Sequence, residues 1–402
     1  MRILAMTNLY PNPYQPLRAT FNRDSLRILS ERHAVQVIAP ISWTDERRFR
    51  KAGAVTMPVN RRVVMDNLTV DHPKYWYLPK AMRSWYGCFF QWSVQSAFQS
   101  ALTEFKPDIV FAPWAYPDGW AAVRLARRAG LPVVLKVHGS DVLLAKDHRG
   151  RERGTAEALS RADGVVAVSD HLAARVRELG AKPERTTTII DGVNLEVFCP
   201  GDREIAQKKL GLKPGTRHLL FIGSLAPVKG IDVLLEACTL LPSHLAPWEL
   251  HLIGEGKMRA ELVAQAKRAG LSDRVTFLDG RPHAELPDWF RAADVFVLAS
   301  RSEGTPNVLL EASACGTPYV ATTVGGIPAM AHLGTSRLVP PEDPKRLAEA
   351  IAGSLIESPS PVPGRARDRQ LAVADLEAFL SRTLERHRTE NGKQVARSGS
   401  IQ

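Results

Sequence analysis

Two acidic residues, Glu303 and Glu311, flank the start of a short helical pattern in the stretch SRSEGTPNVLLEAS. Glu303 lies in a loop-like run with Gly304 and Pro306, directly after the strand pattern DVFVLAS. Thr305 is expected to cap the helix and Pro306 to be its first residue, where the N–H that proline lacks would be unpaired anyway. Glu311 then lies about 7–8 Å along a helix that rises 1.5 Å per residue. The pattern therefore places one carboxylate before the helix and one inside it.

The helix start between these carboxylates is expected to bind an anion. The amides of Asn307, Val308 and Leu309 would lie at the positive end of the helix dipole. A diphosphate bound there would have a carboxylate on each side, in the order sugar, diphosphate, ribose of a nucleotide-sugar. Carboxylates accept hydrogen bonds from vicinal hydroxyls well, so Glu303 is expected on the sugar and Glu311 on the ribose. On spacing alone, one glutamate that complements the dipole and one that faces solvent explain the pattern equally well.

Three further strand ends favour a binding site. FIGSLAPVKGIDVLLEA is a strand, a glycine turn and a helix, and its Lys229 is the cation that a diphosphate leaving group needs. HLIGEGKMRAEL places Gly254 and Gly256 where a base or ribose can approach closely. KVHGSD places His138 and Asp141 at a strand end in the first half of the chain. A lone histidine is more often structural, but beside the other stretches we interpret His138 as functional.

Strand and helix patterns alternate along the chain, with short connections between them. Alternation of this kind predicts parallel sheets with right-handed crossovers. It runs once from RILAM to GVVAVS and again from RHLLFIGS to TPYVATT, which predicts an α/β protein of two doubly wound, Rossmann-like domains facing a central cleft. Ligands of such sheets bind at the carboxyl ends of the strands. We expect an N-terminal domain over residues 1–195, a C-terminal domain over 196–360, and a last helix with a disordered basic tail over 361–402.

Length and composition fit a two-domain protein of the cytoplasm. The chain has 402 residues, and its apolar fraction is 45%. Its four cysteines are scattered without C-x-x-C spacing, which argues against a zinc site or a disulfide framework and favours a reducing compartment. No window approaches 18 apolar residues, so no membrane span is expected. The N-terminal apolar run is too short for a signal peptide.

The net charge of +11 is concentrated in one segment. Residues 47–92 hold nine Lys or Arg against two Asp, and nine of the 28 aromatic residues. Basic and aromatic side chains together suggest an anionic membrane surface or a polyanion. A basic face around a packed insertion is the alternative. No signature of nucleic-acid binding accompanies the charge, so no nucleic acid is expected as a partner.

The motifs GSLAPVKG, ADVFVLASRSEGTPNVLLEASACGTP and TTVGGIP together resemble the family 4 glycosyltransferases. In the first half, APWAYPDGWAAVRLARRAGLPVVLKVHGSDV, VVAVSDHLAARV and the linker IIDGVNLEVF also resemble this family. The resemblance implies the GT-B fold and an enzyme that transfers a sugar with retention from a nucleotide-diphosphate sugar. The implied acceptor is a lipid-linked glycan or a growing cell-surface polysaccharide. The implied location is the cytoplasm, with peripheral attachment to the inner face of the plasma membrane.

The resemblance also implies a role for each matching residue. Glu303 would hold the donor sugar and support charge at its anomeric carbon, His138 would contact the sugar near the reacting centre, and Glu311 would bind ribose. Lys229 would neutralise the diphosphate. The other implied donor-binding residues are Gly223, Ser224, Gly254, Gly304, Thr305, Pro306, Asn307, Val308 and Leu309. Asp141 and Arg18 are candidates for the acceptor side. No metal and no other cofactor is implied, in keeping with a chain that has no D-x-D.

Three departures from the family pattern stand out. Ser224 occupies a position where the family often has arginine, so a phosphate-binding cation is missing or is supplied by Arg281 or Arg301. The loop NLYPNPYQPLRATFNRD has none of the glycines common after the first strand, and Ala329 stands where an acidic residue commonly follows GGIP. Two other functions stay open, a nucleotide-sugar epimerase on the same fold and an inactive, charged binding protein.

Overall fold

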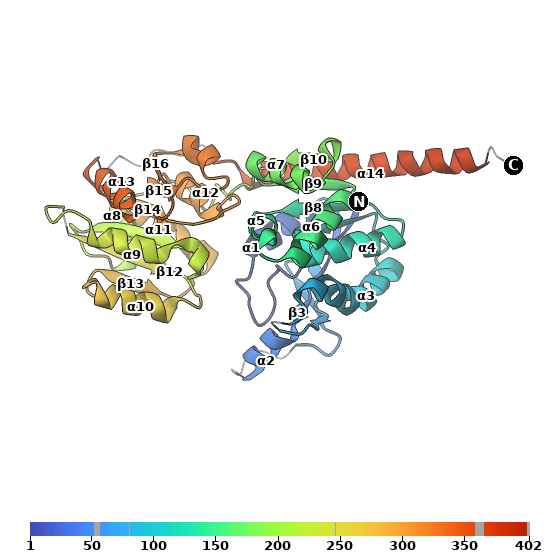
Figure 1. Ribbon diagram of the computed structural model, residues 1–402, viewed down its shortest axis with the longest axis horizontal. Helices are drawn as coiled ribbons and strands as arrows, with labels where there is room; N and C mark the ends of the chain where they lie inside the picture. The colour runs from blue at the N-terminus through green and yellow to red at the C-terminus, as the bar shows by residue number, and fades with distance from the viewer. Residues whose placement is uncertain (52–56, 80, 246, 358–365, 400–402) are drawn as a thin grey trace. The chain divides into compact units, whose positions relative to one another are not determined.

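The computed structural model describes residues 1–51, 57–79, 81–245, 247–357 and 366–399 (Figure 1). The chain divides into two compact units. Unit 1 comprises residues 1–190 and 370–402, and unit 2 comprises residues 191–369. The division falls slightly before the expected boundary at residue 195, and the C-terminal segment belongs to unit 1. No helix in the described part of the chain is both long enough and apolar enough to cross a membrane.

An eight-stranded sheet forms the centre of unit 1, in the order β10-β9-β8-β7-β1-β2-β5-β4. All neighbours are parallel except β4 and β5, which form an antiparallel hairpin at one edge. Alternate residues of a strand enter separate cores: Leu4 and Met6 pack on one face, and Ile3 and Ala5 on the other. The inner strands are therefore apolar on both faces, as expected of a covered parallel sheet. The strands are β1 (Arg2–Met6), β2 (Ala34–Ile38), β4 (Arg62–Met65), β5 (Leu68–Asp71), β7 (Ile109–Ala112), β8 (Val133–Val137), β9 (Gly164–Ala167) and β10 (Thr186–Thr188), with β3 (Ile41–Ser42) and β6 (Lys74–Tyr75) in a separate pair.

Helices cover both faces of this sheet. Residues of α3, α4, α6 and α7 share the core that contains Leu4, whereas residues of α1 and α14 share the core that contains Ile3. The helices of unit 1 are α1 (Thr20–Ser30), α2 (Trp43–Lys51), α3 (Tyr86–Glu104), α4 (Trp120–Arg128), α5 (Ser140–Leu143), α6 (Arg149–Arg161), α7 (Asp170–Glu178) and α14 (Arg369–Gly399).

The C-terminal helix α14 is longer than the sequence suggested (Figure 1). It continues to Gly399 through the polar stretch that was expected to be a disordered tail. That stretch contains two glycines and Asn391, but also five residues that favour helix: Glu390, Lys393, Gln394, Ala396 and Arg397. Its tail residues 400–402 lie outside the described residues. Phe379 of α14 packs so closely on β9 that a Cβ on Gly164 would lie 2.7 Å from its ring, so the helix is an integral layer of unit 1.

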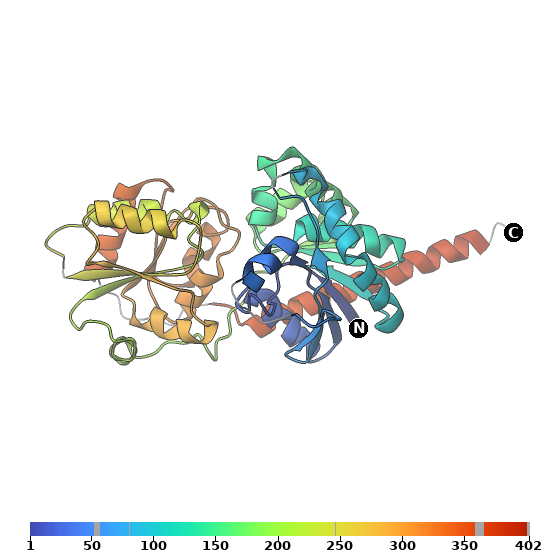
Figure 2. The ribbon, with the colours of Figure 1, turned by 90° about the horizontal axis from the view of Figure 1, so that it is seen from below.

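Unit 2 is a six-stranded, all-parallel sheet in the order β13-β12-β11-β14-β15-β16. It lies between two layers of helices, α9, α10 and α13 in one and α8, α11 and α12 in the other (Figure 2). The strands are β11 (Arg217–Ile222), β12 (Trp248–Ile253), β13 (Val275–Leu278), β14 (Val295–Leu298), β15 (Tyr319–Thr322) and β16 (Ser336–Val339). The helices are α8 (Arg203–Leu210), α9 (Ile231–Thr239), α10 (Arg259–Arg268), α11 (Leu286–Ala292), α12 (Asn307–Ala314) and α13 (Pro344–Glu357).

The strand order of unit 2 brings distant loops together. Since β11 is paired in parallel with both β12 and β14, the loops that follow these strands leave the same edge of the sheet. The loop after β15 leaves this edge as well, because β15 pairs in parallel with β14. Most of the donor-binding residues predicted from the sequence lie in these loops.

Candidate active site

Glu303 and Lys229 are in contact, although 74 residues separate them in the chain. Lys229 ends the short 3-10 helix η5 (Pro227–Lys229), which follows β11, and Glu303 lies in the loop after β14. Lys229 Nζ donates to Glu303 Oε1 at 2.6 Å. The buried hydroxyl of Ser300 donates to the same oxygen at 2.6 Å. One carboxylate oxygen thus holds two donors, and the Glu303 side chain is only 10% exposed.

The loop that carries Glu303 is fixed by its neighbours. Thr322 Oγ1 donates to Ser300 O at 2.6 Å, and Gly326 N donates to Gly304 O at 2.8 Å. Gly325 has φ 57°, and a Cβ there would lie 1.7 Å from Glu303 O. Only glycine fits this approach, so the GG of TTVGGIP is explained by how closely the loop after β15 supports the loop after β14.

Helix α12 begins one residue later than predicted. Pro306 occupies the capping position with ψ 112°, and Asn307, not Pro306, is the first helical residue. The Thr305 side chain is therefore not the cap; the extended backbone of Pro306 ends the loop, and its carbonyl accepts from Leu309 N at 3.0 Å. The Leu309 amide is thus used within the first turn, and Asn307 and Val308 remain the predicted anion-binding amides. In the described part of the chain, nothing bonds to the buried Oδ1 of Asn307.

Glu311 is bonded to a histidine that the sequence analysis did not single out. His283 Nε2 lies 2.8 Å from Glu311 Oε1, and the carboxylate side chain is 5% exposed. The histidine belongs to the 3-10 helix η6 (His283–Glu285), which follows β13, and its ring packs on Phe198 at 4.8 Å between centroids. The sequence did contain a signal for this histidine, because His283 follows a strand that ends at the same sheet edge as those before Lys229 and Glu303.

Close backbone packing accounts for Gly254. A Cβ on this residue would lie 1.8 Å from Gly223 O. Glycine is therefore required here because the backbone at the ends of β11 and β12 packs so closely. This packing is a structural reason for glycine at this position, and the approach of a base or ribose to Gly254 stays a prediction. Backbone packing also explains the glycine at position 256, where a Cβ would lie 2.2 Å from Leu225 O. Ser224 lies exposed between these positions.

Arg301 does not replace the arginine that is missing at position 224. Its guanidinium forms two bonds to Asp232, at 2.7 and 2.9 Å, and further bonds to Glu342. These partners raise the pKa of Arg301 above its usual value, Asp232 contributing most. Its charge is thus matched by two carboxylates. Arg281 is exposed in the loop between β13 and η6 and remains the other candidate.

In unit 1, His138 follows β8 and packs between aromatic rings. Its ring centroid is 4.9 Å from that of Phe21 and 6.4 Å from that of Trp114. Asp141 is fully buried, and its carboxylate accepts from the backbone N–H of His138, Gly139 and Ala115 at 2.9–3.1 Å. Asp141 therefore fixes the turn that carries His138, and its expected place on the acceptor side stays a prediction.

Arg18 holds the loop after β1. Its Nε donates to Asn8 O at 3.1 Å and its guanidinium to Gln15 Oε1 at 3.2 Å. The same loop is bonded to Asp118, whose Oδ2 accepts from Thr7 Oγ1 at 3.1 Å and from Asn8 N at 2.7 Å. Burial raises the pKa of Asp118 to about 7. This role was not predicted, since its partners Thr7 and Asn8 lie 111 and 110 positions away in the chain.

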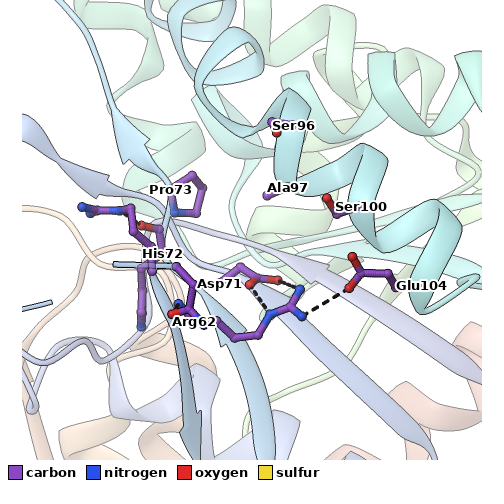
Figure 3. Close-up of a pocket in the computed structure, with 10 residues that line it drawn as sticks. Arg62, Asp71, His72, Pro73, Ser96, Ala97, Ser100 and Glu104 are labelled. Carbon is purple, nitrogen blue, oxygen red and sulfur yellow. Dashed lines mark hydrogen bonds and ion pairs between the residues drawn. The ribbon is translucent and has the colours of Figure 1, made fainter. Parts of the chain in front are cut away.

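A pocket of about 360 Å³ lies elsewhere in unit 1, between the β4–β5 hairpin and α3 (Figure 3). None of the predicted site residues lines it. Arg62 spans Asp71 and Glu104 across one wall, as Figure 3 shows, so its charge is already paired. Arg61 is likewise bonded to Glu46. We therefore assign the pocket no part in the site.

The basic, aromatic segment at 47–92 exposes large apolar side chains. Trp76, Trp85 and Trp92 are all about half exposed or more, with Trp92 at 67%. Leu78 and Met82 are also exposed. Residues 52–56 and 80 of this segment lie outside the described residues. The described part thus carries both kinds of side chain that favour an interface between membrane and water.

Comparison with known proteins assigns the family. A model described as Glycosyl transferases group 1 matches residues 216–356, and one described as Glycosyltransferase Family 4 matches residues 20–197. D-inositol 3-phosphate glycosyltransferase 1 of Catenulispora acidiphila is 33% identical over 293 residues, 66% of this chain and 70% of that protein. The matches span 60% to 70% of the first three such relatives.

Solved structures agree in fold at low sequence identity. Sucrose-phosphate synthase from Thermosynechococcus elongatus has a TM-score of 0.74 at 20% identity, and each chain is covered completely. HepE from Anabaena, solved with UDP-glucose, has a TM-score of 0.69 at 19% identity and covers 97% of this chain and 100% of its own. These likenesses confirm the predicted GT-B fold of two Rossmann-like domains. With the family matches, they establish that the chain is a glycosyltransferase and belongs to glycosyltransferase family 4.

Proposed function

We propose that this glycosyltransferase takes its sugar from a nucleoside-diphosphate sugar bound at the carboxyl edge of the unit 2 sheet. The observation that carries the proposal is the contact of Lys229 with Glu303 beside the start of α12. A donor of this class joins a diphosphate, which needs a cation and amides, to a sugar, which needs hydrogen-bond acceptors. HepE, of the same fold, was solved with such a donor.

Glu303 acts on the sugar in this proposal. Its Oε1 is shared by Ser300 and Lys229, and its other oxygen accepts from a sugar hydroxyl. As the bond from the anomeric carbon to the diphosphate breaks, the carboxylate stabilises the positive charge that develops on the sugar. The acceptor oxygen forms the new bond on the same face, and its proton passes to the departing phosphate oxygen. Retention of configuration follows from attack on that face.

The leaving diphosphate is neutralised without a divalent metal. Lys229, whose ammonium also bonds to Glu303, supplies part of a positive charge, and the start of α12 supplies roughly half a charge. Arg301 adds none, because Asp232 and Glu342 match it. Metal-dependent relatives of this chemistry hold Mg²⁺ or Mn²⁺ on closely spaced carboxylates, a D-x-D pattern that the sequence lacks. Arg281 is the residue we propose to add to the charge of Lys229.

The acceptor is proposed to be lipid-linked and reached at an anionic membrane surface. The exposed Trp76, Trp85 and Trp92 support this, together with the basic residues around them. The curated relatives favour a second candidate, since their names describe glycosyl transfer to D-inositol 3-phosphate. That acceptor is a soluble phosphate ester and would not need the exposed tryptophans.

The test is a transfer assay with labelled donors. UDP-, GDP- and ADP-sugars are each incubated with D-inositol 3-phosphate, with lipid-linked glycans in vesicles, and with no acceptor, and the anomeric configuration of the product is read by NMR. Transfer with retention in excess EDTA is the expected result. Inversion at the sugar C2 without transfer would show an epimerase, and binding without turnover an inactive binder. Loss of activity in EDTA that Mg²⁺ or Mn²⁺ restores would overturn the metal-free mechanism.

A further inference from the structure

A second group of ligand-type side chains lies on β11 and β12 of the unit 2 sheet, outside the loops of the candidate active site. His218 of β11 pairs in register with Glu249 of β12, and Leu220 pairs with His251. Since alternate residues of a strand share a face, His218, Glu249 and His251 stand on one face of the sheet. One ligand atom from each lies within 4.8 Å of the others. In the described part of the chain, this is the one group of three His, Cys, Asp or Glu residues with that spacing.

We propose that His218, His251 and Glu249 bind one transition-metal ion of the zinc type. Two imidazole nitrogens and a carboxylate suit Zn²⁺, Co²⁺ or Ni²⁺ better than Mg²⁺ or Ca²⁺, which prefer oxygen ligands. Two nitrogens on a tetrahedral zinc, at 2.0–2.1 Å each, lie roughly 3.3 Å from one another. His218 Nδ1 and His251 Nε2 are 3.1 Å apart, close to that separation, and both rings must tilt so that their lone pairs meet at one ion.

The surroundings of His218 leave the correct nitrogen for a metal. Its Nε2 lies 3.3 Å from Lys213 O and donates to that carbonyl, which keeps the lone pair on Nδ1. A backbone carbonyl that holds the other ring nitrogen is the usual support of a metal-binding histidine. In the metal-free protein, His251 Nε2 carries the proton and donates to His218 Nδ1. On binding, that proton moves to His251 Nδ1, and the ion takes the place of the N–H···N bond.

Both imidazole rings of the proposed metal site are buried in the core of unit 2. His218 and His251 are 1% and 4% exposed, and Trp289 of α11 packs 5.6 Å from the His251 ring.

Lys213 lies at the solvent-exposed side of the three proposed ligands. Its side chain is 71% exposed and forms an ion pair with Glu249, which is the most accessible of the three ligands. A divalent ion on Glu249 would repel the ammonium, so binding must open the Lys213–Glu249 pair. It follows that removal of the Lys213 charge should strengthen metal binding, whereas removal of any of the three ligands should weaken it.

The bound ion would be structural. His218 lies five residues before Gly223 and His251 three residues before Gly254, about 17 and 10 Å along strands that rise 3.3 Å per residue, so the ligands are not part of the donor-binding loops. It would link β11 to β12, whose far ends carry Gly223 and Gly254. Its contribution to the stability of unit 2 would grow with free metal as RT ln(1 + [M]/Kd).

The experiment uses the full chain without a histidine tag, stripped with a chelator and titrated with Zn²⁺ by calorimetry and with Co²⁺ by absorption. We expect one ion per chain, a tetrahedral Co²⁺ spectrum, and a thermal midpoint that rises with Zn²⁺. His218→Gln and His251→Gln should each bind at least about tenfold more weakly. His244→Gln, which changes an exposed histidine of the same unit, is the matched control and should bind like the wild type.

Two milder variants keep the proposal testable if a core histidine variant does not fold. Glu249→Gln should weaken binding, and Lys213→Met should tighten it several-fold. The proposal is overturned if no stoichiometric site is found, if the ligand variants bind as the wild type does, or if Lys213→Met and Glu249→Gln move affinity in the same direction. Because the site lies outside the donor loops, EDTA should lower the thermal midpoint and leave the initial transfer rate intact.

Discussion

Glu303 holds two hydrogen-bond donors on one oxygen, which determines what its replacement should change. Glu303→Gln keeps the shape and the buried position but removes the negative charge proposed to stabilise the sugar in the transition state. We expect kcat to fall at least about tenfold, or ~1.4 kcal/mol, with a smaller change in donor KM. Steady-state transfer kinetics measure this. Glu261→Gln, on an exposed site of α10, should leave both constants unchanged; a normal kcat for Glu303→Gln would remove Glu303 from the mechanism.

Glu311 and His283 should behave as a binding pair. A buried carboxylate that accepts from ribose hydroxyls contributes charge-assisted bonds of about 1.5–3 kcal/mol, so Glu311→Ala should raise donor KM by roughly tenfold to a hundredfold. His283→Ala should shift KM in the same direction by less, because the histidine orients Glu311 from 2.8 Å. kcat should change little in either variant. If His283→Ala alters kcat and leaves KM unchanged, the two residues do not act together.

The sequence predicts which residues lie at strand ends, but not which distant residues pair with them. Lys229 and Glu303 were both placed in the donor site because each follows a parallel strand, and such strand ends share an edge; the bond between them was not predicted. Arg301 was a candidate for the cation missing at position 224, and its partners Asp232 and Glu342 could not be foreseen because they are 69 and 41 positions away in the chain. His283 was missed for the same reason, since nothing local in the sequence links it to Glu311. Partners set by tertiary packing leave no local pattern.

Among the secondary-structure elements, the two parallel sheets were predicted from strand–helix alternation, but the edge strands of the unit 1 sheet were not. The β4–β5 hairpin and the short β3–β6 pair come from segments with no regular period. The start of α12 was misplaced by one residue because proline fits both the capping and the first helical position. That single residue decides which amides can reach an anion.

The loop after β1 depends on the protonation of Asp118. Its pKa is raised by burial to about 7, while Arg18 lowers it and Asp141 raises it further. Between its ordinary value near 4 and pH 7, the folded state holds this proton more tightly than the unfolded state, so stability falls as pH rises through that window. At about 1.4 kcal/mol per pH unit, ionisation of Asp118 lowers the free energy of unfolding by at most a few kcal/mol by pH 8.

Asp118→Asn should abolish this pH dependence. The amide oxygen can still accept from Thr7 and Asn8, and the side chain cannot ionise. We therefore expect the thermal midpoint of the variant to gain on that of the wild type between pH 5 and pH 8. Calorimetry at both pH values measures this, with Asp279→Asn, an exposed carboxylate of unit 2, as control. A constant difference across the range would mean that Asp118 does not titrate there.

At the scale of the molecule, the chain returns to its first unit. A last helix within residues 361–402 was predicted from the sequence, but not the surface that it covers. Leu376, Phe379 and Leu380 of α14 share a core with Ile3 and Val134 from two strands of unit 1. An amphipathic pattern shows that a face must be covered and does not show by what. The C-terminal helix is therefore part of unit 1 although it follows unit 2 in the chain.

The exposed aromatic residues of unit 1 lead to a prediction about membranes. A soluble protein has little reason to expose Trp85 and Trp92 beside a basic stretch, whereas tryptophan is favoured where lipid headgroups meet water. Each nearby Lys or Arg adds about 1 kcal/mol of attraction to an anionic leaflet, and this attraction is screened by salt. Binding to vesicles should therefore rise with anionic lipid content and fall as salt is added.

Two substitutions separate the aromatic contribution from the charge. The double variant Trp85→Ser, Trp92→Ser should lose most binding at moderate salt and retain a weak, salt-sensitive part that comes from the basic residues. Ile205→Ser changes an equally exposed apolar residue of unit 2 and should bind like the wild type. Co-sedimentation with vesicles of rising anionic content measures all three proteins. If the wild type fails to bind even at low salt, the tryptophans serve another contact, and a soluble acceptor such as an inositol phosphate becomes the better-supported substrate.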